Sequence, residues 1–209
     1  PLLAEGAHSF QVRASDRAGN VGAPADYSWT VDVTAPEATI TGGPADPTNA
    51  TSASLSFSGS DNLDALAQLS FQCRLDHPAS DWAACSSPQG YDLLAAGRHS
   101  FQVRATDRAG NVGAPADYSW TVDLSAPESA IGERPPDPSN SSSASFSLGG
   151  SDNLDELSQL SFQCRLDSAE ASAWAACSSP KSYAELAEGV HTLELRALDR
   201  AGNVDASPD

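Results

Sequence analysis

The sequence predicts an all-β protein built from tandem β-sandwiches of about 91 residues each. Three observations predict it: a long motif that recurs at a period near 91, short segments in which apolar and polar residues alternate, and clusters of Gly, Pro, Asn and Asp between those segments. A sandwich domain of about 100 residues matches this period, whereas repeats that share a core with their neighbours are only about 20 to 50 residues long. We therefore expect each repeat to bury a core of its own.

The repeated motif shows that the chain contains duplicated domains. Segments 8–32 and 99–123 carry the same 25 residues, except that Ser15 in the first is Thr106 in the second. A third, more divergent copy begins at His191. The motif aspartates are spaced 91 and 92 residues apart: Asp16, Asp107 and Asp199.

Alternating segments within one period predict the strands. Apolar residues at every second position place one face of a strand in the core and the other in solvent. The clearest examples are Ala53–Phe57, Leu69–Leu75, Phe101–Ala105 and Tyr118–Val122. This phase predicts core residues Phe71, Leu75, Phe101, Val103, Tyr118 and Trp120, and outer residues Gln72, Arg74, Gln102 and Arg104. Between two strands, Asn62–Gln68 has leucine spacing that predicts about one helical turn after Asp61.

Two short Pro-containing segments predict the joints between repeats. Thr34–Pro36 and Ser125–Pro127 each follow a predicted final strand and precede the next repeat. Such short linkers leave little freedom, so we expect successive repeats to be held in nearly fixed orientations. The predicted domains are 1–35, the C-terminal part of a repeat; 36–126, a complete repeat; and 127–209, a repeat that lacks its last strand.

Composition limits the partners. The formal charge of -17 disfavours binding to nucleic acid and to anionic membrane surfaces. No segment approaches the roughly 20 apolar residues that cross a bilayer, so we expect no membrane contact within this stretch. The chain starts at Pro1 and contains no Met. We expect it to be part of a longer protein.

Four cysteines occur at matching places in two repeats. Cys73 and Cys85 are 12 residues apart, and Cys164 and Cys177 are 13 apart. One disulfide in each repeat is the expected pairing, and it requires an oxidising compartment. A metal site is the alternative, but the Cys-x-x-Cys spacing and the paired histidines of zinc sites are lacking.

The residues around these cysteines resemble a known family. Four segments and the Ala-Pro joint are similar to bacterial immunoglobulin-like repeats of large surface proteins and adhesins. The segments are FQCRLD at 71–76, WAACSSP at 82–88, residues 96–112 and YSWTVD at 118–123. Similar repeats occur in some algal surface proteins. The resemblance covers essentially the whole chain and implies tandem immunoglobulin-like β-sandwiches, secreted or displayed on a cell surface. It also implies that some joints are stiffened by calcium.

Acidic residues offer a candidate site, for which two interpretations are open. Asp107 and Asn111 flank a tight turn, and Asp61 and Asp123 supply further oxygens in the same repeat. Hard oxygen ligands are those that Ca²⁺ requires, so these four residues are the candidate metal ligands and Ca²⁺ the only candidate cofactor. Alternatively, Asp107 caps its own turn while Gly110 adopts positive φ.

The other polar residues favour a structural function. His8, His99 and His191 share one repeated position, and only His77 has no counterpart. Catalysis needs a unique constellation, which a duplicated set of polar clusters does not supply. We therefore expect no enzymatic activity. Two sequons, at Asn49 and Asn140, predict glycosylation if the source is eukaryotic.

The resulting hypothesis is a non-enzymatic spacer, stalk or filament segment of an extracellular surface protein. Its expected partners are neighbouring repeats of the same chain, other copies in a surface filament, or a host or surface ligand. An adhesive or carbohydrate-binding array and an accessory region of a secreted enzyme are the alternatives. The adhesive function would need exposed aromatic side chains, for which Trp82 and Trp174 are the candidates.

Overall fold

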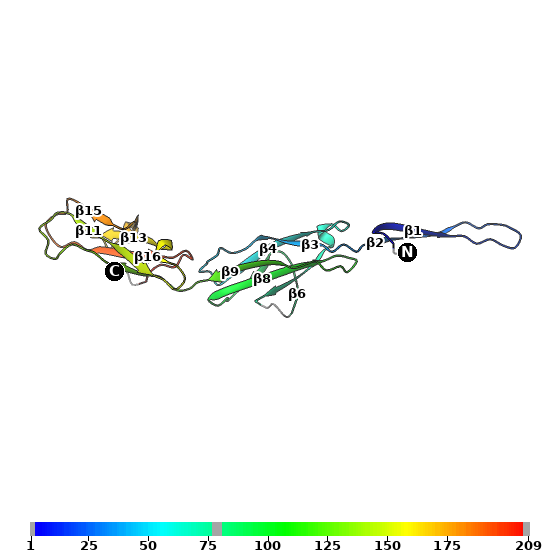
Figure 1. Ribbon diagram of the computed structural model, residues 1–209, viewed down its shortest axis with the longest axis horizontal. Coiled ribbons are helices and arrows are strands. Elements are labelled where there is room, and N and C mark those ends of the chain that lie inside the picture. The colour runs from blue at the N-terminus through cyan, green and yellow to red at the C-terminus, as the bar shows by residue number, and fades with distance from the viewer. Residues whose placement is uncertain (1–2, 77–80, 207–209) are drawn as a thin grey trace. The chain divides into compact units, whose positions relative to one another are not determined.

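The fold was obtained as a computed structural model, which describes residues 3–76 and 81–206. His77 lies outside these residues. The protein is all-β (Figure 1). The only helices among the described residues are single turns of 3-10 helix, at η1 (Leu66–Gln68), η2 (Leu157–Gln159) and η3 (Ala171–Ala173). None of them is long and apolar enough to cross a membrane.

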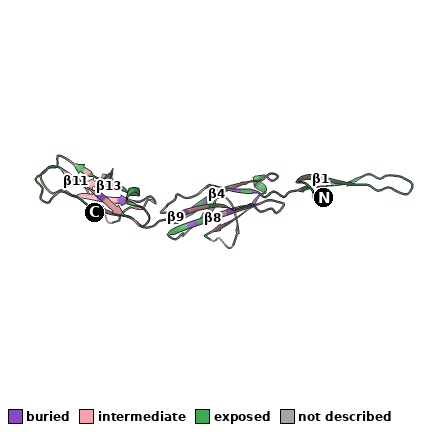
Figure 2. Ribbon diagram, viewed as in Figure 1, coloured by how far each residue is buried: buried purple, intermediate pink, exposed green. Residues whose placement is uncertain are grey.

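The N-terminal strands form a hairpin with little buried surface. Strands β1 (Gly6–Val12) and β2 (Ala25–Val31) pair antiparallel, with His8 opposite Trp29 and Phe10 opposite Tyr27. Most of their residues are exposed, as the green ribbon of Figure 2 shows. Phe10 is 57% exposed and Tyr27 67%. This hairpin carries the same alternation as residues 97–106 and 116–122 of the next repeat, but within the described residues no second sheet covers its apolar face.

Two sheets follow in the middle of the sequence. One has the order β3-β4-β7 and the other the order β6-β5-β8-β9. Their strands are β3 (Glu37–Gly42), β4 (Ala53–Ser60), β5 (Ser70–Leu75), β6 (Ala83–Cys85), β7 (Gln89–Tyr91), β8 (Gly97–Thr106) and β9 (Ala116–Val122). Strands β5 and β8 are joined in register from Ser70 opposite Thr106 to Leu75 opposite Phe101.

The core between these sheets follows the predicted phase. Leu55, Phe101 and Val103 are fully buried, and the ring of Phe57 on β4 lies 6.1 Å from that of Phe101 on β8. Phe101, Val103 and Trp120 are therefore core residues, as predicted. Phe71, Leu75 and Tyr118 were predicted to join them but are only half-buried.

The C-terminal part repeats this plan. Its sheets have the orders β10-β12, β11-β15 and β14-β13-β16. The strands are β10 (Glu128–Ile131), β11 (Ala144–Phe146), β12 (Leu148–Ser151), β13 (Ser161–Leu166), β14 (Ala175–Cys177), β15 (Lys181–Tyr183) and β16 (Leu193–Leu198). Leu148, Cys164 and Leu195 form the buried core.

The chain forms two compact units. One comprises Pro1–Gly43, Leu55–Gln89 and Ser100–Tyr118; the other comprises Pro44–Ser54, Gly90–His99 and Ser119–Asp209. The sheets and cores place the chain in the class of tandem immunoglobulin-like β-sandwiches, as the sequence predicts.

The predicted helical turn is shorter than expected. The segment 62–68 begins as a bend, in which the carboxylate of Asp61 accepts hydrogen bonds from the N–H groups of Leu63 and Asp64, both at 2.9 Å. Only its last three residues, η1, are helical. The side chain of Gln68 accepts a bond from Ala65 N–H, which closes this turn.

Candidate metal centre

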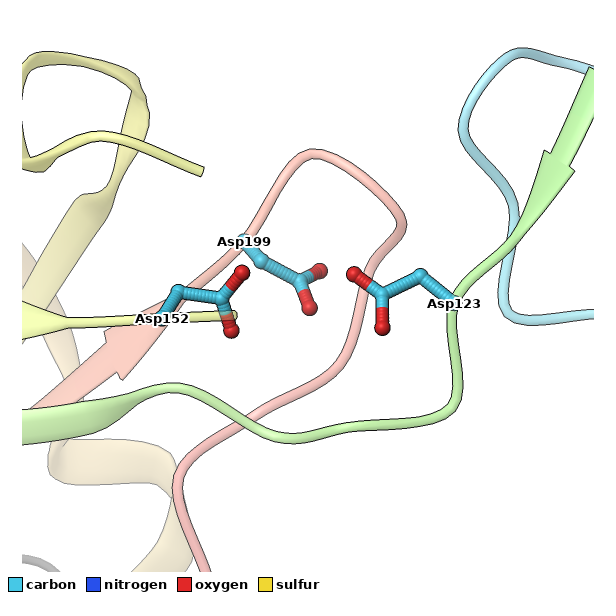
Figure 3. Close-up of side chains that lie close together, drawn as sticks. All are labelled: Asp123, Asp152 and Asp199. Atoms are coloured by element: carbon cyan, nitrogen blue, oxygen red, sulfur yellow. The ribbon is translucent and has the colours of Figure 1, made fainter. Parts of the chain in front are cut away.

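Three aspartates converge within the second unit. Asp123, Asp152 and Asp199 are each the first residue after a strand, namely β9, β12 and β16. Each offers a carboxylate oxygen, and these three oxygens lie within 4.8 Å of one another. Figure 3 shows the three side chains pointing toward a common point. The ends of three strands therefore form one acidic cluster.

Asp123 is held by its backbone and by one of its two carboxylate oxygens. Its N–H donates to the carbonyl of Thr48 at 2.9 Å, and its carbonyl accepts a bond from Asn203 Nδ2 at 2.9 Å. Its Oδ1 accepts from Ser125 N–H at 3.1 Å. The residue is only 4% exposed, and its Oδ2 is buried without a hydrogen-bond partner among the described residues.

Asp152 has the same division between its two oxygens. Oδ2 accepts hydrogen bonds from the N–H groups of Leu154 at 2.8 Å and Asp155 at 2.9 Å. Oδ1 is buried and, within the described chain, has no partner. The backbone bonds fix the carboxylate in orientation while leaving its second oxygen free to bind something else.

Asp199 caps the turn that follows β16. Its Oδ1 accepts from Gly202 N–H at 2.7 Å and Asn203 N–H at 2.8 Å, and its Oδ2 accepts from Asn203 Nδ2 at 2.7 Å. Gly202 has φ +95°, a conformation that glycine adopts without steric cost. The turn thus brings Asn203 within reach of both Asp199 and Asp123.

Arg200, in the same turn, does not neutralise the cluster. Its Nε donates to Asp155 Oδ1 at 2.7 Å, and its backbone N–H donates to Asp155 Oδ2 at 2.7 Å. Asp155 is 5% exposed, so this pair compensates a buried charge. The same pair occurs between Arg108 and Asp64 in the middle repeat. Among the described residues, the three clustered aspartates have no ion-pair partner.

The first unit carries aspartates at the corresponding positions, one period earlier. Asp32, Asp61 and Asp107 directly follow β2, β4 and β8. Asn111 Nδ2 donates to the carbonyl of Asp32 at 3.2 Å, as Asn203 does to Asp123. Asp61 Oδ1 is buried without a partner in the described residues, like Asp152 Oδ1. The strand-end aspartates, the asparagine bond and one buried oxygen without a partner among the described residues therefore recur one period earlier.

Two pKa shifts agree with this placement. Burial, which outweighs the hydrogen bond from Thr34 N–H, raises the pKa of Asp32, and the negative charges of Asp107 and Asp61 raise it further. Burial would also raise the pKa of Asp107, but hydrogen bonds from the Asn111 side chain and from backbone N–H groups outweigh it. The pKa of Asp107 therefore lies below its ordinary value, and the charged form is favoured.

The four residues proposed as metal ligands from the sequence belong to two clusters. Asp61, Asp107 and Asn111 lie with Asp32, while Asp123 lies with Asp152 and Asp199. Asp107 caps its own turn, accepting from Gly110 and Asn111 N–H, as the capping interpretation predicts. The four candidate ligands all came from one repeat, 36–126. The missed signal is that all six aspartates follow strands at one-period spacing.

The predicted disulfides are both present. Cys73 is bonded to Cys85, and Cys164 to Cys177. Each joins neighbouring strands of one sheet, β5 with β6 and β13 with β14. The bridge of antibody domains, by contrast, joins two sheets. The sequon residues Asn49 and Asn140 are both exposed.

The tryptophans beside the cysteines are covered by arginines. The guanidinium groups of Arg74 and Arg104 lie 4.4 Å from the ring centre of Trp82. Arg104 also donates to Gln72 Oε1 at 2.8 Å and 3.0 Å. Arg165 and Arg196 stack on Trp174 in the same way. These contacts occupy the outer face of the sheet and engage the aromatic rings.

The comparisons with known proteins concern the fold alone. No protein-family model matches the chain, and no curated protein matches its sequence. Solved structures with a similar fold include fibronectin(III)-like modules of Clostridium thermocellum CbhA, at 13% identity and a TM-score of 0.46, covering 83% of this chain and 90% of that one. The FN1-FN3 domains of chicken CNTN1 match at 11% identity and a TM-score of 0.44, covering 97% and 73%. Domains A168-A170 from titin match at 12% identity and a TM-score of 0.43, covering 97% of this chain and 72% of that one.

Proposed function

We propose that this chain is a non-enzymatic spacer or stalk segment of an extracellular surface protein, built from rigid immunoglobulin-like repeats. The proposal rests on one type of hydrogen bond that occurs at two places in the chain. Asn111 bonds the carbonyl of Asp32, 79 residues earlier, and Asn203 bonds that of Asp123, 80 residues earlier. With the repeat boundaries proposed from the sequence, each bond joins the end of one repeat to a turn of the next. Such a tie opposes bending at the joint.

The disulfides support the extracellular location. They form and persist in oxidising compartments and are rare in the cytosol. Each repeat has a small core, and a bridge that closes a loop of 12 or 13 residues stabilises such a core by about 3 kcal/mol. Glycans on the exposed Asn49 and Asn140 would fit the same location.

A structural function also fits the duplicated polar groups. The pair of Arg108 with the buried carboxylate of Asp64 has an equivalent in Arg200 with Asp155, with the same bonds. Groups that recur in every repeat stabilise the fold, whereas an active site needs a unique constellation. The proposed partners are neighbouring repeats of the same chain and other copies in a surface filament or a surface ligand.

The adhesive alternative has weaker support. A carbohydrate-binding array would stack sugars on aromatic rings, and Trp82 and Trp174 were the candidates. Each ring already stacks with two arginines. The rings and the arginines stacked on them together cover the outer face of the sheet beside the disulfide.

Small-angle scattering tests the spacer function. We expect an extended particle whose longest dimension grows in proportion to the number of repeats when further copies of 36–126 are joined. In a variant carrying both Asn111→Ala and Asn203→Ala, the same measurement should show a broader distribution of lengths. The control variant Asn20→Ala removes an exposed counterpart whose side chain, among the described residues, bonds only Asp16, and it should leave the curve unchanged. A compact particle for the unmodified chain would contradict the proposal.

A further inference from the structure

The acidic cluster of Asp123, Asp152 and Asp199 has no positively charged partner among the described residues. Like charges this close repel one another, and burial strengthens the repulsion. Asp123 is 4% exposed and Asp199 7%. Native proteins pair a buried carboxylate with a cation or supply it with hydrogen bonds. Here Asp123 Oδ2 and Asp152 Oδ1 are buried and have neither among the described residues.

Turn formation explains the hydrogen-bonded oxygens of Asp123 and Asp152, but it does not explain Asp123 Oδ2 and Asp152 Oδ1. Asp123 Oδ1 and Asp152 Oδ2 accept backbone N–H bonds, so they account for aspartate as a turn-forming residue. If turn formation were the only function, the second oxygen would face water. Instead both second oxygens are buried, and all three carboxylates point to one place (Figure 3). The backbone bonds then act as the outer contacts that orient ligands around an ion.

The size of the cluster fits calcium. Ca²⁺ binds oxygen at about 2.3 to 2.6 Å, so two of its ligands lie at most about 5 Å apart. The three carboxylate oxygens here lie within 4.8 Å of one another. Mg²⁺ binds at about 2.0 to 2.1 Å and demands a nearly ideal octahedron, so its ligands lie at most about 4.2 Å apart. The larger, less demanding ion suits three side chains carried by three separate strand ends.

We infer that Asp123, Asp152 and Asp199 form a calcium site, and that Asp32, Asp61 and Asp107 form a second one. The duplication supports the second site, because Asp61 Oδ1, like its equivalent Asp152 Oδ1, is buried and has no partner in the part of the chain that the structure describes. Asn203 and Asn111 hold the strand end that carries Asp123 or Asp32 through its carbonyl. Calcium binding does not depend on the proposed spacer function, but its effect on stiffness rests on that function.

Calorimetric titration of the whole chain, stripped of metal with EDTA, tests the sites. We expect two Ca²⁺ per chain, one in the variant Asp152→Asn, and none in Asp61→Asn combined with Asp152→Asn. Asparagine has the same shape and retains an oxygen for the turn, and circular dichroism verifies that each variant is folded. The control Asp92→Asn removes the same charge from an exposed position and should still bind two.

Three results would overturn the inference. They are no binding by the unmodified chain, an unchanged stoichiometry in the double variant, and Mg²⁺ binding as tight as Ca²⁺. A variant that fails to fold does not block the test, because the unmodified chain should also show a thermal midpoint that rises with Ca²⁺ concentration. The spacer function fails separately: an extended particle that binds no Ca²⁺ keeps the spacer and refutes the sites, whereas a compact particle with two bound Ca²⁺ does the opposite.

Discussion

Asn203 donates a hydrogen bond from Nδ2 to the backbone carbonyl of Asp123 at 2.9 Å, across 80 residues of sequence. The same nitrogen also donates to Asp199 Oδ2 at 2.7 Å. One amide group therefore satisfies a carbonyl at the end of β9 and a carboxylate at the end of β16. Both acceptors belong to buried residues.

We expect Asn203→Ala to lower the free energy of unfolding by about 1 to 3 kcal/mol, because it leaves two buried acceptors without a donor. Urea denaturation followed by circular dichroism measures the change. Asn20→Ala is the matched control: Asn20 makes the same bond to Asp16 in an exposed turn, so its loss should cost less than about 0.5 kcal/mol. Equal effects in the two variants would contradict the importance of the buried bond.

Removing one disulfide should destabilise the C-terminal repeat. Replacing Cys164 and Cys177 by Ser opens a loop of 13 residues, and loop entropy predicts a loss of about 3 kcal/mol. Urea denaturation followed by the fluorescence of Trp174, which lies beside the bridge, reports this repeat. Replacing Cys73 and Cys85 should leave the Trp174 transition unchanged. A loss seen equally in both double variants would show that the repeats do not unfold separately.

The strand pattern could be predicted because it depends on neighbours in sequence. Alternation placed Phe101 and Val103 in the core, where they are fully buried, and paired cysteines in each repeat predicted both disulfides. Phe71 was predicted as a core residue but is half-buried, because alternation tells which face a side chain is on and not how well the opposite sheet covers it.

The acidic clusters were harder to predict for a related reason. Asp107 caps its own turn, a short-range relation that the spacing Asp107 to Asn111 suggested. Asp123 instead joins Asp152 and Asp199, which are 29 and 76 residues later. Periodicity within a repeat carries no information about which strand ends meet. The recurrence of an aspartate directly after β9, β12 and β16 was the available signal.

His191 should make stability depend on pH. Its Nε2 lies 2.8 Å from the carbonyl of Ala187 and its Nδ1 2.6 Å from Asp167 Oδ2, so both nitrogens face acceptors and the charged ring can donate to both. The Ala187 carbonyl and then the Asp167 carboxylate raise the pKa of His191. Hydrogen bonds from His191 and from Thr192 N–H lower the pKa of Asp167.

The direction of the effect follows from these two shifts. A raised histidine pKa adds stability that is complete below the ordinary value of about 6.5 and is lost as the pH rises through the folded-state pKa. The lowered pKa of Asp167 adds stability that is present above about 3.9 and is lost as the pH falls. We therefore expect His191→Gln to reduce the thermal midpoint most between about pH 4 and 6.5 and least at pH 9. Parallel curves for wild type and His191→Gln would refute the ion pair.

Two adjacent glycines of β12 should respond oppositely to the same substitution. A Cβ at Gly150 would lie 2.6 Å from the backbone carbonyl oxygen of Glu128 on the paired strand β10, and a backbone atom inside a sheet cannot move aside easily. A Cβ at Gly149 would lie 3.8 Å from the carbonyl oxygen of Ala130, an ordinary contact. Neither glycine has the positive φ that excludes alanine.

Gly150→Ala should therefore lower the free energy of unfolding by about 1 to 3 kcal/mol through overpacking. Gly149→Ala should be neutral or raise it by up to about 1 kcal/mol, because alanine restricts the unfolded chain more than glycine does. Urea denaturation of the two variants, which differ only in which neighbouring residue gains the methyl group, measures both. Gly59 has a less close approach, 3.0 Å to the Glu37 carbonyl oxygen, so Gly59→Ala should be less destabilising than Gly150→Ala. If Gly149→Ala proves as harmful as Gly150→Ala, the cost comes from strand propensity and not from contact with β10, and the register of β10 against β12 would need another explanation.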